Sequence, residues 1–305
     1  MPRRAFILAA GLGTRLRPYT EKVPKPLFHI LGVPLLEILL ENLKKAGFKE
    51  IGLNLHHLAP QIARFLEEYQ KRNPEISVTT FYEKEILGPI GALRGARPFF
   101  EKSPVLVVNG DILTNFPFAT LLEAHKRLEG LATLLLHHFP PYNKVLLRGE
   151  EVTGFEEGKG FAYTGLQVVT PELVSRLRPE DRELVPVYER FLEEGARISA
   201  LVGTGFYWQD IGTLPSYLAA HEDLLKRRAV IPGLPPPPSP CVLSGARVAA
   251  GVVFEDWVFL EPGVEVSPEA RLRRVVAWAG ARIPPGFHQE KLFLPERIER
   301  DGEFS

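Results

Sequence analysis

Residues 5–27 read AFILAAGLGTRLRPYTEKVPKPL. The run from Ala5 to Ala10 is apolar and stops at Gly11, a pattern typical of a short buried strand that ends in a turn. Gly11 and Gly13 would let backbone N–H groups approach a phosphate without a Cβ in the way, and Arg15 carries a guanidinium that can bind phosphate oxygens. This stretch therefore predicts a strand followed by a phosphate-binding turn.

A dinucleotide-binding turn is one alternative for these residues. The third glycine of G-x-G-x-x-G is missing, because Leu16 stands there, and prolines follow where a helix should begin. The spacing also differs from that of a G-x-x-x-x-G-K-[ST] loop. Two glycines after a strand occur in purely structural turns as well, so the residues alone leave that alternative open.

Strand and helix patterns alternate through the first two-thirds of the chain. Apolar or β-branched runs predict strands at Ile51–Leu55, Ile76–Tyr82, Val105–Val108, Leu131–Leu136 and Tyr163–Val169. Between them, apolar residues at helical spacing predict helices, the first of which ends near Gly47. This order predicts an α/β fold with a doubly wound, mostly parallel sheet, in which ligands bind beyond the carboxyl ends of the strands.

A proline-rich segment divides the chain. We predict an N-terminal domain over residues 1–231, a stiff linker over 232–240 and a separate unit over 241–305. In that unit an apolar residue recurs at every sixth position, at Val242, Val248, Phe254, Leu260, Val266, Leu272 and Trp278. The repeat indicates a short parallel β-helix; irregular strands packed on the first domain are the alternative, because the glycine spacing slips between Gly263 and Gly280.

The composition limits the partners of the protein. Of its 305 residues 45% are hydrophobic and 24% charged, and Lys plus Arg equal Asp plus Glu at 37 each, so no overall field favours nucleic acid or an anionic membrane. We expect neither partner. The lone Cys241 and the lack of a long apolar stretch predict a cytoplasmic protein, and few Cys and Met residues are typical of a thermophile.

The string LAAGLGTRLRPYTEKVPKPL resembles the signature of the sugar nucleotidyltransferases, the nucleoside-diphosphate-sugar pyrophosphorylases. Later motifs of that family recur in order at residues 85–92 (EILGPIGA), 107–111 (VVNGD), 164–169 (TGLQVV) and 208–213 (WQDIGT). The resemblance covers residues 5 to about 225. It implies a Rossmann-like nucleotidyltransferase domain, and the hexapeptide left-handed β-helix common in these enzymes agrees with the sixfold repeat.

The resemblance implies an enzyme that condenses a nucleoside triphosphate with a sugar 1-phosphate and releases pyrophosphate. It assigns Arg15 to the triphosphate tail, Lys25 to the phosphates near the reacting centre, and Asp111 with Asp210 to Mg²⁺, a cation that prefers oxygen ligands. The implied nucleotide-binding residues are Leu8, Ala10, Gly11, Gly13, Thr14, Arg15, Glu85 and Gly91. Those implied for the sugar phosphate are Asn109, Glu156 and Gly165.

This chain departs from the family pattern in two places. Where many members carry E-K-P, it has Glu156-Glu157-Gly158, so we predict that Lys159 replaces the missing lysine. Pro89-Ile90 also replaces the small polar pair often found before the glycine that contacts the base.

The segment after Glu85 resembles guanylyltransferases, which favours GTP and a hexose 1-phosphate, mannose 1-phosphate first. Uridylyl or thymidylyl transfer to glucose 1-phosphate or to an amino-sugar 1-phosphate is the alternative. Two rivals belong to other classes: a non-catalytic regulatory paralogue that binds nucleotide sugars, and a dinucleotide-dependent oxidoreductase. We expect the C-terminal unit to pack on the first domain or to make contacts in a homo-oligomer.

Overall fold

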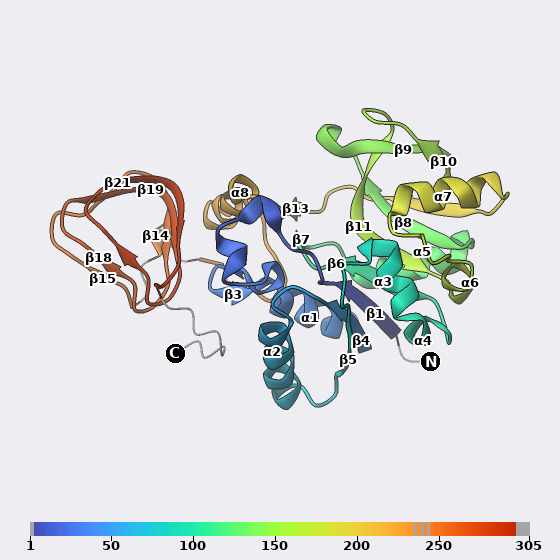
Figure 1. Cartoon of the computed structure of the whole chain (residues 1–305). Helices are drawn as coiled ribbons and strands as arrows, with labels where there is room; N and C mark the ends of the chain where they lie inside the picture. The colour runs from blue at the N-terminus through green and yellow to red at the C-terminus, as the bar shows by residue number, and fades with distance from the viewer. Residues whose placement is uncertain (1–2, 235, 238, 240, 243–244, 297–305) are drawn as a thin grey trace.

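The structure is a computed structural model that describes residues 3–234, 236–237, 239, 241–242 and 245–296. Figure 1 shows a large α/β part, coloured blue to yellow, and a smaller coiled part, coloured orange to red, that lies against α8 (Leu214–Leu225). Within the described ranges, no helix is long and apolar enough to cross a membrane.

The first predicted strand is an interior strand of a mixed sheet of nine strands. The order is β5 (Ser77–Tyr82), β4 (Phe48–Leu55), β1 (Arg3–Leu8), β6 (Val105–Asn109), β11 (Phe161–Val169), β8 (Ala132–His137), β12 (Ile198–Val202), β10 (Glu151–Phe155) and β9 (Asn143–Arg148). From β5 to β6 neighbouring strands are parallel, as are β8 and β12. The sheet is nevertheless mixed, because β11 runs antiparallel to β6 and β8, and β10 runs antiparallel to β12 and β9.

Side chains of β1 alternate between the two faces of the sheet, and helices cover both faces, as a doubly wound fold requires. Ala5 and Ile7 pack in one core with α1 (Leu35–Lys45), α2 (Ala59–Arg72), α5 (Phe118–Leu128) and α8. Phe6 points to the other core, which contains α3 (Gly88–Gly95), α4 (Arg97–Phe100), α6 (Pro171–Ser175) and α7 (Leu184–Glu193). All three side chains are fully buried, because a central strand has a helical layer on each side.

The remaining elements of the large part are short. They are η1 (Thr14–Leu16), η2 (Tyr19–Glu21), η3 (Lys25–Leu27), β2 (His29–Ile30), β3 (Val33–Pro34), β7 (Ile112–Thr114), η4 (Pro140–Tyr142) and β13 (Trp208–Asp210). The strands β7 and β13 form an antiparallel pair of their own. This pair joins two segments that lie far apart in the sequence.

The C-terminal strands stack in parallel coils, an arrangement consistent with a β-helix. The strands are β14 (Cys241–Val242), β15 (Arg247–Val248), β16 (Val253–Phe254), β17 (Val258–Leu260), β18 (Glu265–Val266), β19 (Ala270–Ala277), β20 (Arg282–Ile283) and β21 (Gly286–Phe293). Arg247 pairs with Glu265 and Glu265 with Arg282, one residue from each of three successive coils. The interior is apolar and includes Leu260 and Leu272 of the sixfold repeat.

Among the members of the repeat whose side chains the structure describes, Trp278 is the exception. Its side chain does not enter the interior of the coils but packs in the core of the large domain. Arg274 has a left-handed φ of 55°, and so does Glu290 in the adjacent strand at 53°. The pairing of β19 with β21 skips both residues. An extra residue reverses the alternation of faces, so Val275 points inward and Trp278 outward.

Candidate active site

Two carboxylates meet beyond the end of β6. Asp111 follows β6 and precedes β7, while Asp210 is the last residue of β13. Antiparallel pairing places Asp210 opposite Ile112, and the N–H of Ile211 donates to the carbonyl of Asp111 at 2.8 Å. Burial raises the pKa of Asp210, and the charge of Asp111 raises it further. The two acidic side chains therefore form one electrostatic unit.

Two cationic side chains from the N-terminal segment face these carboxylates. Lys25, in η3, places Nζ 2.5 Å from Oδ2 of Asp111 and 3.9 Å from Oδ1 of Asp210. Arg15, in η1, has Nη2 3.5 Å from Oδ2 of Asp210. Lys25 is buried, with 9% of its side chain exposed, whereas 59% of the Arg15 side chain is exposed. Lys25 is thus held inside the cluster, while Arg15 covers it from the solvent side.

Glycines keep this cluster open. A Cβ on Gly212 would lie 2.5 Å from Nη2 of Arg15 and 2.6 Å from Oδ2 of Asp210. Gly13 has a left-handed φ of 62°, which admits glycine most readily, and a Cβ there would meet Thr20 Cγ2 at 2.8 Å. Nothing lies within 4 Å of a Cβ built on Gly11, so the backbone there is free of side-chain cover. The predicted phosphate cradle has the open backbone that such a role requires.

The turn predicted to bind phosphate is held by two buried polar residues, Asn54 and Glu83, that the sequence analysis did not single out. The N–H of Ala9 donates to Oδ1 of Asn54 at 2.7 Å, and Nδ2 of Asn54 donates to Oε1 of Glu83 at 2.8 Å. Oε2 of Glu83 in turn accepts from the N–H of Leu87 at 3.1 Å. One signal in the sequence could have pointed to this role, because the polar Asn54 stands near the end of the otherwise apolar run Ile51–Leu55.

The other residues predicted to bind the nucleotide lie in two places, the end of β1 with the turn after it and the segment around α3. Leu8 is its last residue, and its carbonyl accepts from the N–H of Gly110 at 2.8 Å. Ala10 is buried in the turn, and Thr14 begins η1. Glu85 is exposed in the loop before α3. Gly91 is buried in α3, where a Cβ would lie 3.0 Å from the Cβ of Leu87, so tight packing explains the glycine there.

A cavity of about 330 Å³ opens beside the acidic pair. Asn109 and Gly165 both line it, and a Cβ on Gly165 would lie 2.9 Å from Nδ2 of Asn109. The indole of Trp208 forms a wall, fixed by a 2.7 Å hydrogen bond from its Nε1 to the carbonyl of Thr164. The residues that line the cavity are Arg15, Asn109, Asp111, Ile112, Pro141, Tyr142, Lys144, Glu157, Tyr163, Thr164, Gly165, Trp208 and Asp210.

The cavity contains a lysine, but not the predicted one. Lys159 and Glu156 are not among the lining residues; they form an exposed 2.6 Å ion pair with each other. Lys144 on β9 lines the cavity instead, with Nζ 3.7 Å from Oε1 of Glu157. The N–H of Glu156 donates to the carbonyl of Lys144 at 2.7 Å, so the two segments lie side by side. Strand pairing brings a lysine near the site from a position that the linear motif does not reveal.

The arrangement suits reactions of phosphate groups. Two cations, two carboxylates and an uncovered glycine turn lie at the carboxyl edge of the sheet, next to a cavity of small-molecule size. Cationic side chains and backbone N–H groups can bind phosphate oxygens and neutralise charge that develops during phosphoryl transfer.

Comparison with known proteins agrees with this chemistry. Residues 4–143 match the nucleotidyl transferase family model. The chain is 31% identical to a UTP–glucose-1-phosphate uridylyltransferase of Synechocystis sp., over 81% of this chain and 70% of that protein. It is 30% identical to probable mannose-1-phosphate guanylyltransferase 2 of Oryza sativa subsp. japonica, over 92% of this chain and 82% of that protein.

A solved structure shares the fold. The crystal structure of HddC from Yersinia pseudotuberculosis, complexed with GMP-PN, is 26% identical and superposes with a TM-score of 0.60, over 73% of this chain and 99% of that chain. The motifs, the α/β architecture and the two relatives agree. The chain belongs to the sugar nucleotidyltransferases and is a nucleotidyltransferase enzyme.

Proposed function

We propose that this enzyme transfers a guanylyl group from GTP to a hexose 1-phosphate. Mannose 1-phosphate is the sugar phosphate that we favour, and Mg²⁺ is the proposed cofactor. The observation that carries the proposal is the meeting of Arg15 and Lys25 with Asp111 and Asp210 beside one cavity. These groups come from the beginning, the middle and the end of the α/β domain. A surface role for the two cations would not require Lys25 to be buried between two carboxylates.

The proposed chemistry needs positioning and charge neutralisation more than proton transfer. An oxygen of the sugar phosphate attacks the α-phosphorus, and the bond from that phosphorus to the pyrophosphate oxygen breaks. The nucleophile is already an anion, so no general base is required. Lys25 would hold the phosphates at the reacting centre, and Arg15 would bind the triphosphate tail, so that the two polyanions align.

The acidic pair fits a magnesium ion. Asp111 and Asp210 supply carboxylate oxygens, and the raised pKa of Asp210 reflects burial and a like charge that a divalent cation would relieve. Among the described residues, no group of three or more His, Cys, Asp or Glu side chains could hold a metal. Mg²⁺ is commonly bound by one or two carboxylates together with substrate phosphates. When bound, the ion would neutralise charge on the departing pyrophosphate.

The base and the sugar are the finer part of the proposal. The guanylyltransferase of rice and the GMP-PN complex of HddC support GTP. The uridylyltransferase of Synechocystis supports the alternative, uridylyl or thymidylyl transfer to glucose 1-phosphate or an amino-sugar 1-phosphate. For the sugar phosphate, we now favour Lys144 over Lys159 as the cation, because Lys144 lines the cavity beside Asn109 and Gly165.

The decisive experiment is a pyrophosphate-release screen of the common triphosphates against a panel of sugar 1-phosphates. We expect the highest kcat/KM for GTP with mannose 1-phosphate. A higher value for UTP or dTTP would replace that substrate pair and retain the class of reaction. If no pair released pyrophosphate although nucleotide sugars bound, the regulatory paralogue would be the correct assignment.

We further propose that residues 1–231 are the catalytic domain, 232–240 the linker and 241–305 a left-handed β-helix that also contributes to a homo-oligomer. The end of α8 at Leu225 and the start of β14 at Cys241 support these limits. Pro235, Pro238, Pro240 and residues 297–305 lie outside the described residues. Deleting the chain from Pro235 onward should lower heat stability or change the oligomeric state, and a truncated protein identical to the parent in both would contradict this.

A further inference from the structure

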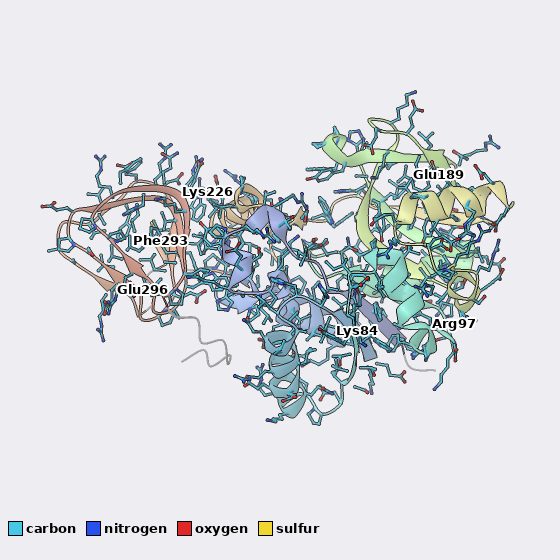
Figure 2. The ribbon with its side chains drawn as sticks, viewed as in Figure 1. Lys84, Arg97, Glu189, Lys226, Phe293 and Glu296 are labelled. Carbon is cyan, nitrogen blue, oxygen red and sulfur yellow. The ribbon has the colours of Figure 1, made fainter. Side chains whose placement is uncertain are left out.

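The C-terminal coils share a core with the catalytic domain. The side chains of Trp257, Phe259, Val276 and Trp278 belong to the cluster that contains α1 and α8. Lys226, labelled in Figure 2 where α8 meets the coils, has Nζ 3.3 Å from Oδ1 of Asp256. Burying apolar side chains of both parts in one cluster makes their separation costly, because each would expose its share to water.

A buried polar pair lies within this shared core. Nδ1 of His29 donates to Oε1 of Glu261 at 2.8 Å, and Oε2 of Glu261 accepts from the N–H of Ala279 at 3.0 Å. The His29 and Glu261 side chains are only 9% and 5% exposed. Both carboxylate oxygens are therefore used, one toward the catalytic domain and one within the coils. Removal of Glu261 would take away the carboxylate that accepts from the buried His29 ring and from the partly buried N–H of Ala279.

Trp278 forms the second contact with the same segment. Its indole stacks on the His29 ring, with centroids 4.3 Å apart and planes at 15°, and it meets Phe28 edge-on at 5.4 Å. Nε1 of Trp278 donates to the hydroxyl of Tyr217 at 3.0 Å, and that hydroxyl donates to the carbonyl of His29 at 2.8 Å. The side chains and the backbone of residues 28–29 are thus held from several directions.

Residues 28–29 lie three and four positions after Lys25, the buried lysine of the active site. The N–H of Phe28 donates to the carbonyl of Lys25 at 3.0 Å, and the N–H of Leu27 donates to the carbonyl of Pro24 at 2.8 Å. Lys25, Phe28 and His29 therefore belong to one short, hydrogen-bonded stretch. It is anchored at one end by Asp111 and at the other by Glu261 and Trp278.

We propose that Glu261 and Trp278 of the C-terminal coils are positioning residues for Lys25. They hold the stretch 25–29 so that the ammonium group stays between the two carboxylates. The coils then contribute to turnover from outside the cavity. The proposal rests on the proposed role of Lys25, since a lysine that binds the reacting phosphates is sensitive to small displacements.

The test compares Glu261→Ala with Glu265→Ala in the full-length protein. Glu265 is a matched control because it lies on the same coils, pairs with Arg247 and Arg282, and is 44% exposed. At a temperature well below the Tm of each variant, we expect E261A to lower kcat by about tenfold or more, with smaller changes in KM. E265A should match the parent. Trp278→Ala should behave as E261A does, and Trp278→Phe, which retains stacking, should recover part of the loss.

The variant Lys25→Ala separates positioning from general destabilisation. If Glu261 acts through Lys25, adding E261A to K25A lowers kcat no further. An equal loss of kcat on both backgrounds would overturn the proposal, and so would a lower Tm with unchanged kcat in E261A. If E261A fails to fold, Glu261→Gln, which retains one acceptor, is carried through the same comparison.

Hydrogen exchange makes the test independent of turnover. We expect the amides of Leu27 and Phe28 to exchange at least about tenfold faster in E261A than in E265A, because local opening becomes easier. Equal exchange in the two variants would overturn the coupling. If the parent released no pyrophosphate with any substrate pair, the proposed function would fail, while the exchange data would still decide whether the coils hold this stretch.

Discussion

Nζ of Lys25 lies 2.5 Å from Oδ2 of Asp111, although 86 residues separate the two in the sequence. The lysine comes from a 3-10 turn after β1, and the aspartate follows the neighbouring strand β6. A buried ammonium requires a partner, and Asp111 and Asp210 supply it. In the proposed reaction, Lys25 exchanges part of this pairing for the phosphates.

Replacing Lys25 with alanine should lower kcat strongly, on the order of 10²-fold, because one preorganised donor to the developing charge is lost. It should also leave Asp111 and Asp210 without their buried cation. Steady-state pyrophosphate release measures the effect. Lys22→Ala, in an exposed position of the same segment, is the control. Equal turnover in the parent and K25A would contradict the assignment.

The variants Asp111→Asn and Asp210→Asn should nearly abolish turnover while the fold survives, since asparagine keeps the shape of the side chain but removes the charge that a magnesium ion needs. A chelator should abolish activity in the parent, and added Mg²⁺ should restore it. Circular dichroism and Tm check that the variants are folded. Full activity in both variants, or in chelator, would refute the metal assignment.

Lys144→Ala should raise the KM for the sugar 1-phosphate by about tenfold or more, because a charge-assisted contact to phosphate is lost from the cavity. Lys159→Ala should leave this KM near the parent value, since Lys159 forms an exposed pair outside the cavity lining. The two variants remove the same charge, so net charge cannot explain a difference. The reverse result would restore the sequence-based assignment of Lys159.

The protein should lose stability as the pH is lowered because of His221, a fully buried residue of α8. Burial lowers the pKa of His221 to about 4, although the hydrogen bond to the Tyr217 carbonyl and the charge of Glu261 oppose this. The N–H of Leu31 donates to Nε2 of His221 at 3.3 Å, and protonation would remove that acceptor. The neutral ring is therefore the form that suits the folded protein.

Below pH 6.5, the usual pKa of histidine, the unfolded chain binds a proton at His221 that the folded chain does not bind until about pH 4. This contribution to the free energy of unfolding is complete above pH 6.5 and is lost as the pH falls from 6.5 to about 4. The total loss is up to about 3 kcal/mol. Urea unfolding across this pH range should show that the free energy of unfolding falls less steeply for His221→Gln than for the parent. If the free energy of unfolding fell equally in both proteins, groups other than His221 would account for the pH dependence.

Much of the fold could be predicted from local patterns. The apolar run that stops at Gly11 is β1, and the helix expected to end near Gly47 is α1, which ends at Lys45. Such patterns depend on neighbours in the sequence, and burial on both faces of a parallel strand leaves a continuous apolar run. The antiparallel direction of β11 was not predictable in this way, because strand direction depends on the path of the connecting chain.

The residue types of the site were also present in the sequence, where Arg15, Lys25, Asp111 and Asp210 stand within recognisable motifs. Their distances were not, because Asp210 reaches Asp111 only through the pairing of β13 with β7. The position of Lys144 in the cavity lining has the same origin, since Lys144 is brought there by the fold and not by its place in a linear motif.

By itself, then, the sequence determined the order of elements, the family and the chemical groups available for phosphate binding. Only the tertiary structure decided which groups meet, that Trp278 points out of its coil, and that Glu261 lies next to His29. The physical reason is that local patterns record burial and backbone preference along the chain. Contacts between distant residues depend on strand register and on the packing of whole elements against each other.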